Sequence, residues 1–357
     1  MRLLAVERLL RKGLDRLAPA TQAAPEPKPE RVFWWWEQIC NLSCNHCDIG
    51  NRTESYRLTP ALGLEQKKQV VDRLSAWLGS GYSLSFIAGE PFLHRDMLDV
   101  LGYASARGAV TSLTTNATLI ATRNRARQVV ESGLAFMAVS IDSMGPSFHD
   151  ETRGRPGTWA QAMKAIEHVR EARTALGRKN PVVYVNSIVM RGNHEELLRL
   201  SDWCKENGIE GHTFQPIATP DFFQGREHQG DHWFQKSELW PDPKDTLALV
   251  DELERRRAGG WPIKNTEADF AAWRTYFRDP TELAKTASCE GELKTLLVTE
   301  TGHVKMCPNT LESFGSILRD DLDGMWSSPA ASRARAHVYE CDSQCKILAN
   351  NKEDFYF

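Results

Sequence analysis

Between Arg31 and Pro216 the sequence alternates short β-prone segments with longer segments of helical periodicity. The expected strands are Val32–Trp36, Tyr82–Ala88, Val110–Thr115, Phe136–Ile141, Val182–Met190 and His212–Pro216. The expected helices lie at about Pro60–Leu78, Met97–Arg107, Arg123–Ser132, Trp159–Leu176 and Glu195–Asn207. This alternation predicts an α/β fold with a parallel sheet and helices on its outside, either doubly wound or a barrel. In both forms the active site lies at the carboxyl ends of the strands.

The loop after the first expected strand holds Cys40, Cys44 and Cys47, with the spacing C-x3-C-x2-C. Three thiols this close can converge on one metal centre. However, structural zinc takes four protein ligands, and an electron-transfer [4Fe–4S] cluster normally has four cysteines. The trio therefore indicates an iron–sulfur cluster with one iron open to an outside ligand. The alternatives are a zinc site that borrows a ligand such as His46, or a redox thiol cluster.

Size and composition indicate a large enzyme. The length of 357 residues suits one barrel plus an appendage, and the net charge of the chain is −3. That charge, and the lack of a dense Lys/Arg stripe, argue against nucleic acid as a partner. Eight cysteines without a secretory signal peptide indicate a reducing compartment, so we expect a cytoplasmic protein. No apolar run approaches the ~20 residues of a transmembrane helix.

The C-x3-C-x2-C spacing resembles the signature of the radical S-adenosylmethionine (radical SAM) enzymes. The resemblance implies that the three cysteines hold a [4Fe–4S] cluster, and that S-adenosylmethionine binds the open iron. It implies reductive cleavage of S-adenosylmethionine to a 5′-deoxyadenosyl radical, which takes hydrogen from a substrate carbon. The cofactor supplies this chemistry, whereas the protein binds and orients it. An electron donor such as flavodoxin or ferredoxin is the implied partner.

Three further motifs follow expected strands in the order of that family. Gly89-Glu90-Pro91, preceded by Ala88, is similar to the Gly-Gly-Glu-Pro motif that binds the amino group of S-adenosylmethionine. Asn116 stands in a stretch similar to Thr-x-Asn-Gly, with Ala117 in place of the glycine. The run from Ser140 and Asp142 to Arg153 resembles a Ser-x-Asp…His-Asp-x-x-Arg-Gly segment. There the resemblance assigns the ribose to Ser140 and the methionyl carboxylate to Arg153, for which a guanidinium is apt.

The resemblance covers about residues 32–217 and implies a partial (β/α)6 TIM-like barrel. His46 stands where many members carry an aromatic residue near the adenine. The expected cofactor contacts are therefore His46, Gly89, Glu90, Pro91, Asn116, Ser140, Asp142 and Arg153.

The second cysteine set is Cys289, Cys307, Cys341 and Cys345. Its C-x12-G-x4-C beginning spans an expected hairpin, 296–299 and 303–306, with Gly302 in the turn, and 316–338 reads as largely helical. This pattern resembles the SPASM extension in its shortened, one-cluster twitch form, although the final C-x3-C departs from the commoner C-x2-C. The resemblance implies that the four cysteines bind an auxiliary [4Fe–4S] cluster. Structural zinc is the alternative.

Four domains are expected. Residues 1–30 combine a basic amphipathic helix at 2–17 with a proline-rich linker. Docking of the helix on its own barrel or on a partner is favoured over binding to a membrane surface. Residues 31–217 form the barrel. Residues 218–284, rich in aromatic residues, form an insert that covers the barrel or packs between domains. Residues 285–357 form the auxiliary-cluster domain. Cys204 lies in an outer helix and is expected to be a buried structural residue rather than a hydrogen donor.

The substrate is not specified by these motifs. Peptide-modifying relatives often have an N-terminal leader-binding domain, and 30 residues before the barrel are too few for one. That favours dehydrogenation or epimerisation of a polar small molecule, such as a sugar or an aminoglycoside-like intermediate. A radical SAM maturase of a ribosomally made peptide is the second reading. A non-catalytic scaffold stabilised by zinc or a cluster is the alternative of another class.

Overall fold

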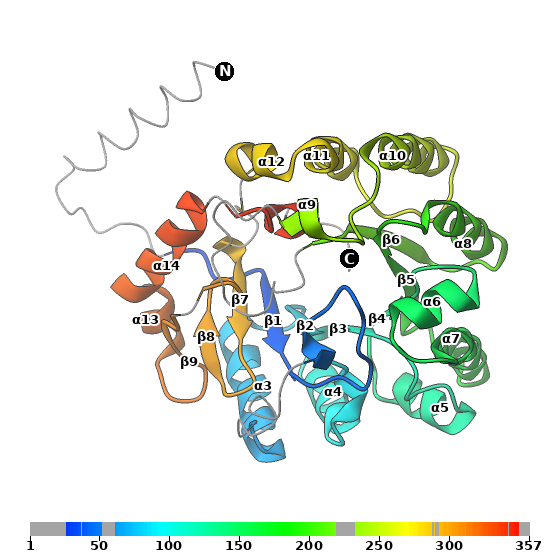
Figure 1. Cartoon of the computed structure of the whole chain (residues 1–357). Coiled ribbons are helices and arrows are strands. Elements are labelled where there is room, and N and C mark those ends of the chain that lie inside the picture. The colour runs from blue at the N-terminus through cyan, green and yellow to red at the C-terminus, as the bar shows by residue number, and fades with distance from the viewer. Residues whose placement is uncertain are drawn as a thin grey trace.

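The computed structural model describes residues 26–36, 38–51, 61–218, 233–287, 289, 293–310, 312–341 and 343–349. Six parallel strands lie side by side in chain order. They are β1 (Arg31–Trp35), β2 (Ser83–Ile87), β3 (Val110–Thr115), β4 (Phe136–Ser140), β5 (Val182–Val189) and β6 (Gly211–Pro216). The sheet curves without closing on itself (Figure 1). This confirms the predicted α/β fold with a partial barrel.

Helices join consecutive strands and cover the outer face of the sheet (Figure 1). They are α3 (Leu64–Leu78), α4 (Met97–Ala106), α5 (Arg123–Glu131), α7 (Thr158–Ala175) and α8 (His194–Glu206). The sequence did not predict α6 (Pro146–Thr152) or the 3-10 turns η1 (Ile49–Asn51) and η2 (Pro91–Leu93). Helix α6 begins with Pro146, where the fixed φ of proline suits a first helical residue.

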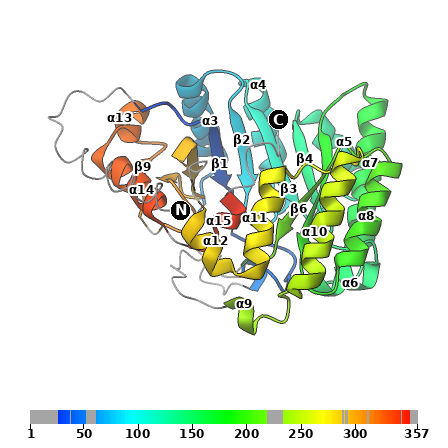
Figure 2. The ribbon, with the colours of Figure 1, turned by 90° about the horizontal axis from the view of Figure 1, so that it is seen from above.

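The segment after β6 continues the outer layer. It contains α9 (Trp233–Lys236), α10 (Pro243–Ala258), α11 (Glu267–Arg278) and α12 (Pro280–Thr286). Helix α10 lies against α8 and α11, so these helices extend the ring of outer helices (Figure 2). The described part of 218–284 therefore packs beside the barrel. The sequence had allowed either a cover over the barrel or packing between domains. Residues 219–232, with the aromatic residues Phe222 and Phe223, lie outside the described residues.

A short stretch between α10 and α11 protects the edge of β6. His212 forms a parallel bridge with Ile263, and its N–H donates to the Pro262 carbonyl at 2.7 Å. The Asn265 side chain continues this pairing: its Oδ1 accepts from the Phe214 N–H at 2.8 Å and its Nδ2 donates to the Phe214 carbonyl at 3.0 Å. The side-chain amide of Asn265 thus makes the hydrogen bonds that a neighbouring strand would make with the edge of β6.

At the other edge the C-terminal hairpin extends the same sheet. Strand β7 (Thr295–Val298) pairs in parallel with β1, and β8 (His303–Lys305) and β9 (Gly315–Ser316) follow in antiparallel order. Helices α13 (Leu322–Trp326), α14 (Pro329–Glu340) and α15 (Lys346–Ala349) complete the chain. The hairpin and the largely helical segment were predicted, whereas the pairing with β1 was not. The proposed domain boundaries stay predictions.

The aromatic first strand separates the two faces of the sheet. Trp34 and Trp36 belong to the main core between sheet and helices. Phe33 and Trp35 alternate with them and pack with Leu297 in a separate cluster. Because successive side chains of a strand point to opposite faces, these three lie on the concave face of the sheet.

The expected N-terminal helix at 2–17 lies outside the described residues, as does most of the linker. Among the helices of the described residues, none has the length and apolar character needed to cross a membrane.

Candidate functional site

The loop with the first three cysteines leaves β1 and packs against the segment that follows α6. The Asn45 N–H donates to the Thr152 carbonyl at 3.0 Å. Gly154 has a φ of 72°, and a Cβ at this position would lie 2.4 Å from the Ser43 carbonyl oxygen. Only glycine therefore lets the two segments approach so closely.

Cys40, Cys44 and Cys47 lie near enough to one another to interact electrostatically. Burial raises the pKa of Cys40 to about 12 and that of Cys47 to about 11, and it raises the pKa of Cys44 against the opposing charge of Arg153. A bound metal would reverse this shift because it deprotonates a coordinating thiol. Within the described ranges no three His, Cys, Asp or Glu side chains converge on a single ion site. Since thiolates of a [4Fe–4S] cluster bind different irons, a cluster does not require that convergence.

Glu90 is buried at the end of β2, where its carboxylate accepts three hydrogen bonds. Its Oε1 accepts from the Thr115 hydroxyl at 2.7 Å and from the Phe92 N–H at 3.2 Å, and its Oε2 accepts from the Asn116 N–H at 2.8 Å. Burial raises the pKa of Glu90 to about 7, although these donors act in the opposite direction. An ammonium group beside it would favour the ionised form. Glu90 therefore joins the ends of β2 and β3 and fits a cationic ligand.

The turns that hold Glu90 and Asn116 have unusual backbone conformations. Ala88 and Gly89 have φ values of 67° and 57°, and Ala117 has a φ of 59°. Ala88 and Ala117 stand where the motifs they resemble have glycine. At these two positions alanine therefore adopts the left-handed backbone conformation that glycine adopts most readily.

Asn116 connects β3 to the cysteine loop. Its Nδ2 donates to the Asn41 Oδ1 at 2.9 Å and lies 3.8 Å from the Cys40 Sγ. The Asn41 Nδ2 in turn donates to the Thr118 Oγ1 at 2.9 Å. The amide of Asn116 is thus fixed beside the first cysteine, as a polar contact for a ligand of the loop would be.

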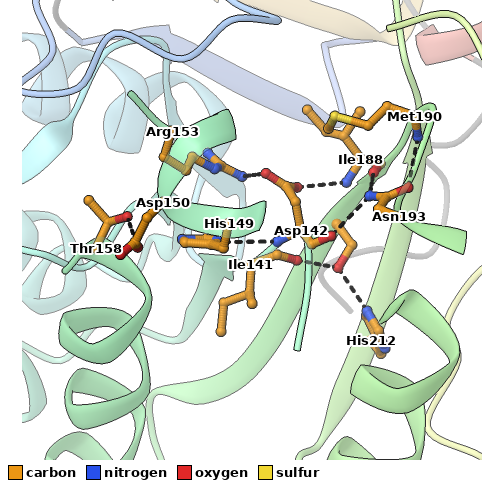
Figure 3. Close-up of polar contacts among 11 residues, drawn as sticks. Ile141, Asp142, His149, Asp150, Arg153, Thr158, Ile188, Met190, Asn193 and His212 are labelled. Atoms are coloured by element: carbon orange, nitrogen blue, oxygen red, sulfur yellow. Dashed lines mark hydrogen bonds and ion pairs between the residues drawn. The ribbon is translucent and has the colours of Figure 1, made fainter. Parts of the chain in front are cut away.

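Figure 3 shows the network at the ends of β4 and β5. Arg153 and Asp142 form a buried ion pair with 2.7 Å between Nη2 and Oδ2, and the Ile188 N–H donates to the other carboxylate oxygen at 3.0 Å. Although burial alone would raise the pKa of Asp142, Arg153 and nearby imidazoles hold it below its usual value. The guanidinium also donates a hydrogen bond to the Cys44 sulfur. Arg153 therefore reaches the cysteine loop, whereas Asp142 is fully buried behind it.

The remaining expected contacts lie around the same rim. His46 is half-buried, and its Nδ1 is a buried nitrogen without a hydrogen-bond partner. Burial and the positive charge of Arg153 lower the pKa of His46 to about 4, so the ring is neutral at pH 7. Ser140 is buried at the end of β4 in register with Asn186 of β5. Pro91 is the first residue of η2.

These groups fit the cofactors that the motifs imply. Three thiols face a common region, a carboxylate suits an ammonium group, and Arg153 has a buried Nε without a hydrogen-bond partner that suits a carboxylate. The structure brings these groups together from the ends of β1, β2, β3 and β4. Asp142 differs from Glu90 because one of its carboxylate oxygens is paired with a buried cationic side chain, Arg153.

Two further residues take part in this network: His149, which belongs to the His-Asp-x-x-Arg-Gly motif but was given no role, and Asn193, which was not identified from the sequence. The His149 Nδ1 accepts from the Asp142 N–H at 3.2 Å, and the fully buried Asn193 donates from Nδ2 to the Asp142 carbonyl at 2.9 Å. The Gly192-Asn193 pair is a recognisable turn signal. Nothing in the sequence, however, shows that the turn contacts the end of β4.

The second cysteine set lies around the hairpin. Cys307 follows β8, Cys341 ends α14, and Cys345 precedes α15. Asn309 links two of them: its N–H donates to the Cys307 Sγ at 3.4 Å and its Nδ2 donates to the Cys345 Sγ at 3.0 Å. Cys289 packs partly buried against the main core. Hydrogen-bond donors such as Asn309 commonly surround the sulfur ligands of a cluster or of zinc. The four-cysteine site itself stays a prediction.

The last cysteine is anchored to the far edge of the barrel. Buried Lys346, next to Cys345, donates to the Ala284 and Ala287 carbonyls at 2.6 and 3.0 Å. The neighbouring Gln344 accepts from the Trp233 Nε1 at 3.1 Å. The C-terminal segment therefore spans from the hairpin beside β1 to the helices beside β6.

The model of the radical SAM superfamily matches residues 38–204. The chain contains a radical SAM domain. This family uses S-adenosylmethionine and a [4Fe–4S] cluster, in agreement with the chemistry of the residues around the three cysteines.

Relatives with assigned activities match different lengths of the chain. An AdoMet-dependent heme synthase of Methanosarcina barkeri is 27% identical over 91% of this chain and 89% of its own length. The heme synthase of Oleidesulfovibrio alaskensis is 29% identical over 56% of this chain, and the match spans about half of that protein (49%). The subtilosin biosynthesis protein AlbA of Bacillus subtilis is 22% identical over 85% of this chain and 60% of its own length.

Solved structures show the same fold. Streptococcus suis SuiB bound to precursor peptide SuiA has a TM-score of 0.63 and 16% identity, over 87% of this chain and 67% of that one. The enzyme anSMEcpe with bound AdoMet and a peptide has a TM-score of 0.61 and 17% identity, over 86% and 82%. At this identity the likeness concerns the fold alone.

Proposed function

We propose that this chain is a radical SAM maturase that removes a hydrogen atom from a carbon of a peptide substrate. The observation that supports it most is the meeting of Cys40, Cys44 and Cys47 with Glu90 and Arg153 at one rim of the barrel. When bound, the cluster and S-adenosylmethionine would supply the electron transfer and hydrogen abstraction. The role of the protein is then to bind, orient and exclude water.

Each residue of the rim has a separate task in this proposal. The three thiolates hold the cluster, and Asn116 orients the cysteine loop beside Cys40. Glu90 accepts the ammonium group of S-adenosylmethionine, and Arg153 donates its Nε–H to the carboxylate of the same ligand. The four cysteines of the C-terminal segment bind an auxiliary cluster that exchanges an electron with the substrate or braces the fold.

The concave face of the sheet supports a peptide substrate. Phe33 and Trp35 form an apolar wall on β1. Across the sheet, half-buried Asn186 lies on the same face as Thr213, whose hydroxyl donates to the Asn186 Oδ1 at 2.9 Å. Amide and hydroxyl groups can pair with a peptide backbone, and the aromatic wall suits an apolar side chain. The sequence analysis gave a peptide as the alternative substrate, and this alternative has more support than a sugar-like substrate, because the relative AlbA is by its name a bacteriocin biosynthesis protein.

A tetrapyrrole is the second candidate substrate. One observation favours it: the Methanosarcina heme synthase aligns with nearly the whole of both chains. The same apolar wall would accept a flat ring system.

The first experiment tests the cofactor assignment. The protein is reconstituted anaerobically, and its iron, sulfide and zinc are measured in wild type and in the Cys40/Cys44/Cys47→Ala variant. We expect about eight irons in wild type and about four in the variant, with 5′-deoxyadenosine formed only by wild type. Retained 5′-deoxyadenosine formation in the variant would refute the assignment. About four irons falling to none would limit the proposal to one cluster.

The second experiment separates the substrates. Reduced enzyme is incubated with S-adenosylmethionine and either deuterated peptides encoded by short reading frames beside its gene or an iron coproporphyrin. Mass spectrometry then follows deuterium in 5′-deoxyadenosine and the mass of each substrate. Deuterium transfer from a peptide supports the first candidate, and conversion of the porphyrin alone replaces it with the second.

A further inference from the structure

The guanidinium of Arg153 has donor groups that point in three directions. One terminal nitrogen pairs with Asp142 at 2.7 Å, a second contact reaches the Cys44 sulfur, and Nε is buried without a hydrogen-bond partner. A guanidinium fork is rigid and planar. Fixing one N–H on a buried carboxylate therefore fixes the direction of the other two.

The Asp142 carboxylate is itself held from several elements (Figure 3). The Ile188 N–H at the end of β5 donates to Oδ1 at 3.0 Å. The Asp142 N–H donates to the His149 Nδ1 on α6, and the Asp142 carbonyl accepts from Asn193 at the start of α8. Asp142 is fully buried, and its carboxylate is paired with Arg153 and with the Ile188 N–H, so its effect on a ligand would pass through Arg153.

Asn193 is the outermost member of this arrangement. Besides the Asp142 carbonyl, its Nδ2 donates to the Ile188 carbonyl at 2.8 Å, and its Oδ1 accepts from the Met190 N–H at 3.1 Å. It therefore binds both the β4 end, which supports Arg153, and the β5 end, which supports Asp142. It has no contact with the cysteine loop among the hydrogen bonds of the described residues.

We propose that Asp142, held in place by Asn193, is a positioning residue for Arg153. Through Arg153 it sets both the reduction potential of the cluster and the affinity for S-adenosylmethionine. This inference rests on the proposed function. A hydrogen bond from a cation to a ligating sulfur raises the reduction potential of a cluster. The same fixed guanidinium directs Nε toward an anionic group of the ligand. A merely structural ion pair would affect folding, but neither of these two properties.

The experiment uses substitutions that keep the charge. Asp142→Glu lengthens the carboxylate by one methylene, and Asn193→Ser removes the amide that seats it. Asp150→Glu is the matched control. Asp150 lies on α6 beside His149, and among the hydrogen bonds of the described residues its carboxylate accepts from Gly157, Thr158 and Trp159 at the start of α7. The readouts on the full reconstituted protein are the midpoint potential of the catalytic cluster, followed by electron paramagnetic resonance, and the dissociation constant of S-adenosylmethionine.

Asp142→Glu is expected to move the midpoint potential to more negative values and to weaken S-adenosylmethionine binding by about 10- to 100-fold, as expected for one charge-assisted hydrogen bond. Asn193→Ser should change both in the same direction by less, and Asp150→Glu should change neither. Unchanged potential and affinity in Asp142→Glu with full iron content would overturn the inference. If that variant does not retain its cluster, Asn193→Ser decides in the same way. Wild type that holds no cluster or binds no S-adenosylmethionine would instead refute the proposed function.

Discussion

Ala88 and Ala117 flank the two residues joined by the 2.8 Å hydrogen bond between the Asn116 N–H and the Glu90 carboxylate, and both adopt the left-handed backbone conformation. A Cβ in this region costs roughly 1–2 kcal/mol. The two alanines differ in how much burial of the methyl group offsets this cost. The Ala117 methyl is fully buried in the main core, whereas Ala88 is only half-buried.

We expect Ala88→Gly to stabilise the protein by about 1 kcal/mol, because glycine removes the backbone strain. Ala117→Gly should be close to neutral, since losing a buried methyl costs about 0.8 kcal/mol and offsets the same gain. Urea unfolding of both variants measures the difference. Ala160→Gly in α7 is the control and should destabilise by about 1 kcal/mol. A loss of stability in Ala88→Gly as large as in the control would contradict the argument.

Gly154→Ala is expected to lower the iron content without removing any ligand. The new Cβ would lie 2.4 Å from the Ser43 carbonyl oxygen, so the cysteine loop must shift. Gly177→Ala is the matched control, since Gly177 also has a positive φ, of 61°, but has no atom within 4 Å of such a Cβ. Iron and sulfide are measured after identical reconstitution. Equal iron content in the two variants would show that the close approach does not matter to the cluster.

Asn265→Ala should destabilise the protein by about 2 kcal/mol. The substitution leaves the buried N–H and carbonyl of Phe214 without partners at the edge of β6, and each unsatisfied group costs about 1–3 kcal/mol unless water reaches it. Chemical unfolding provides the free energy. Asn207→Ala is the comparison, because the exposed Asn207 makes one bond to the Trp203 carbonyl, and it should change stability by less than about 0.5 kcal/mol. Similar losses in both would mean that Asn265 has no special role at the edge.

Features of the fold and the site that depend on residues close together in the sequence could be predicted, whereas those that depend on distant segments could not. The strands and outer helices follow from local periodicity, so their positions were correct within a few residues. Helix α6 was missed because seven residues are too few for a periodic pattern, although Gly145-Pro146 marked its start. The cysteines and Glu90 could be proposed as site residues because their motifs are contiguous.

Other features depend on pairs of segments that are distant in the sequence. Nothing near Leu296 indicates that β7 lies beside β1, and Asn265 reads as an ordinary loop residue. Asp142 was expected to contact the cofactor because it belongs to the same motif as Ser140 and Arg153, and that contact stays a prediction. Its ion pair with Arg153 and its hydrogen bonds with Ile188 and Asn193 could not be predicted from the sequence.

His212 provides a test of pH dependence away from the cysteines. Its ring is fully buried with Nε2 2.9 Å from the Ser187 hydroxyl, and burial lowers its pKa to about 3. The unfolded chain takes up a proton near pH 6.5, whereas the folded chain does not, so stability falls as the pH drops between these values. We expect this group to contribute a loss of about 1.4 kcal/mol per pH unit between about pH 6 and pH 4.

His212→Phe should remove that contribution while keeping a ring of similar size. The free energies of unfolding of wild type and variant are compared by urea titration at several pH values. The difference should shift in favour of the variant as the pH falls. Parallel curves would mean that His212 is protonated in the folded protein.

The parallel pairing of β1 with β7 affects the order in which the protein can be completed during synthesis. Strand β1 is synthesised before β2 to β6, whereas β7, one of its two neighbours, is synthesised after all of them. Until then, the aromatic edge Val32–Trp34 has no partner on that side, and such an edge favours association with other chains. The first cysteine loop is therefore synthesised long before the sheet beside it is complete. A cluster inserted into the nascent chain before β7 is synthesised would therefore meet an incomplete site.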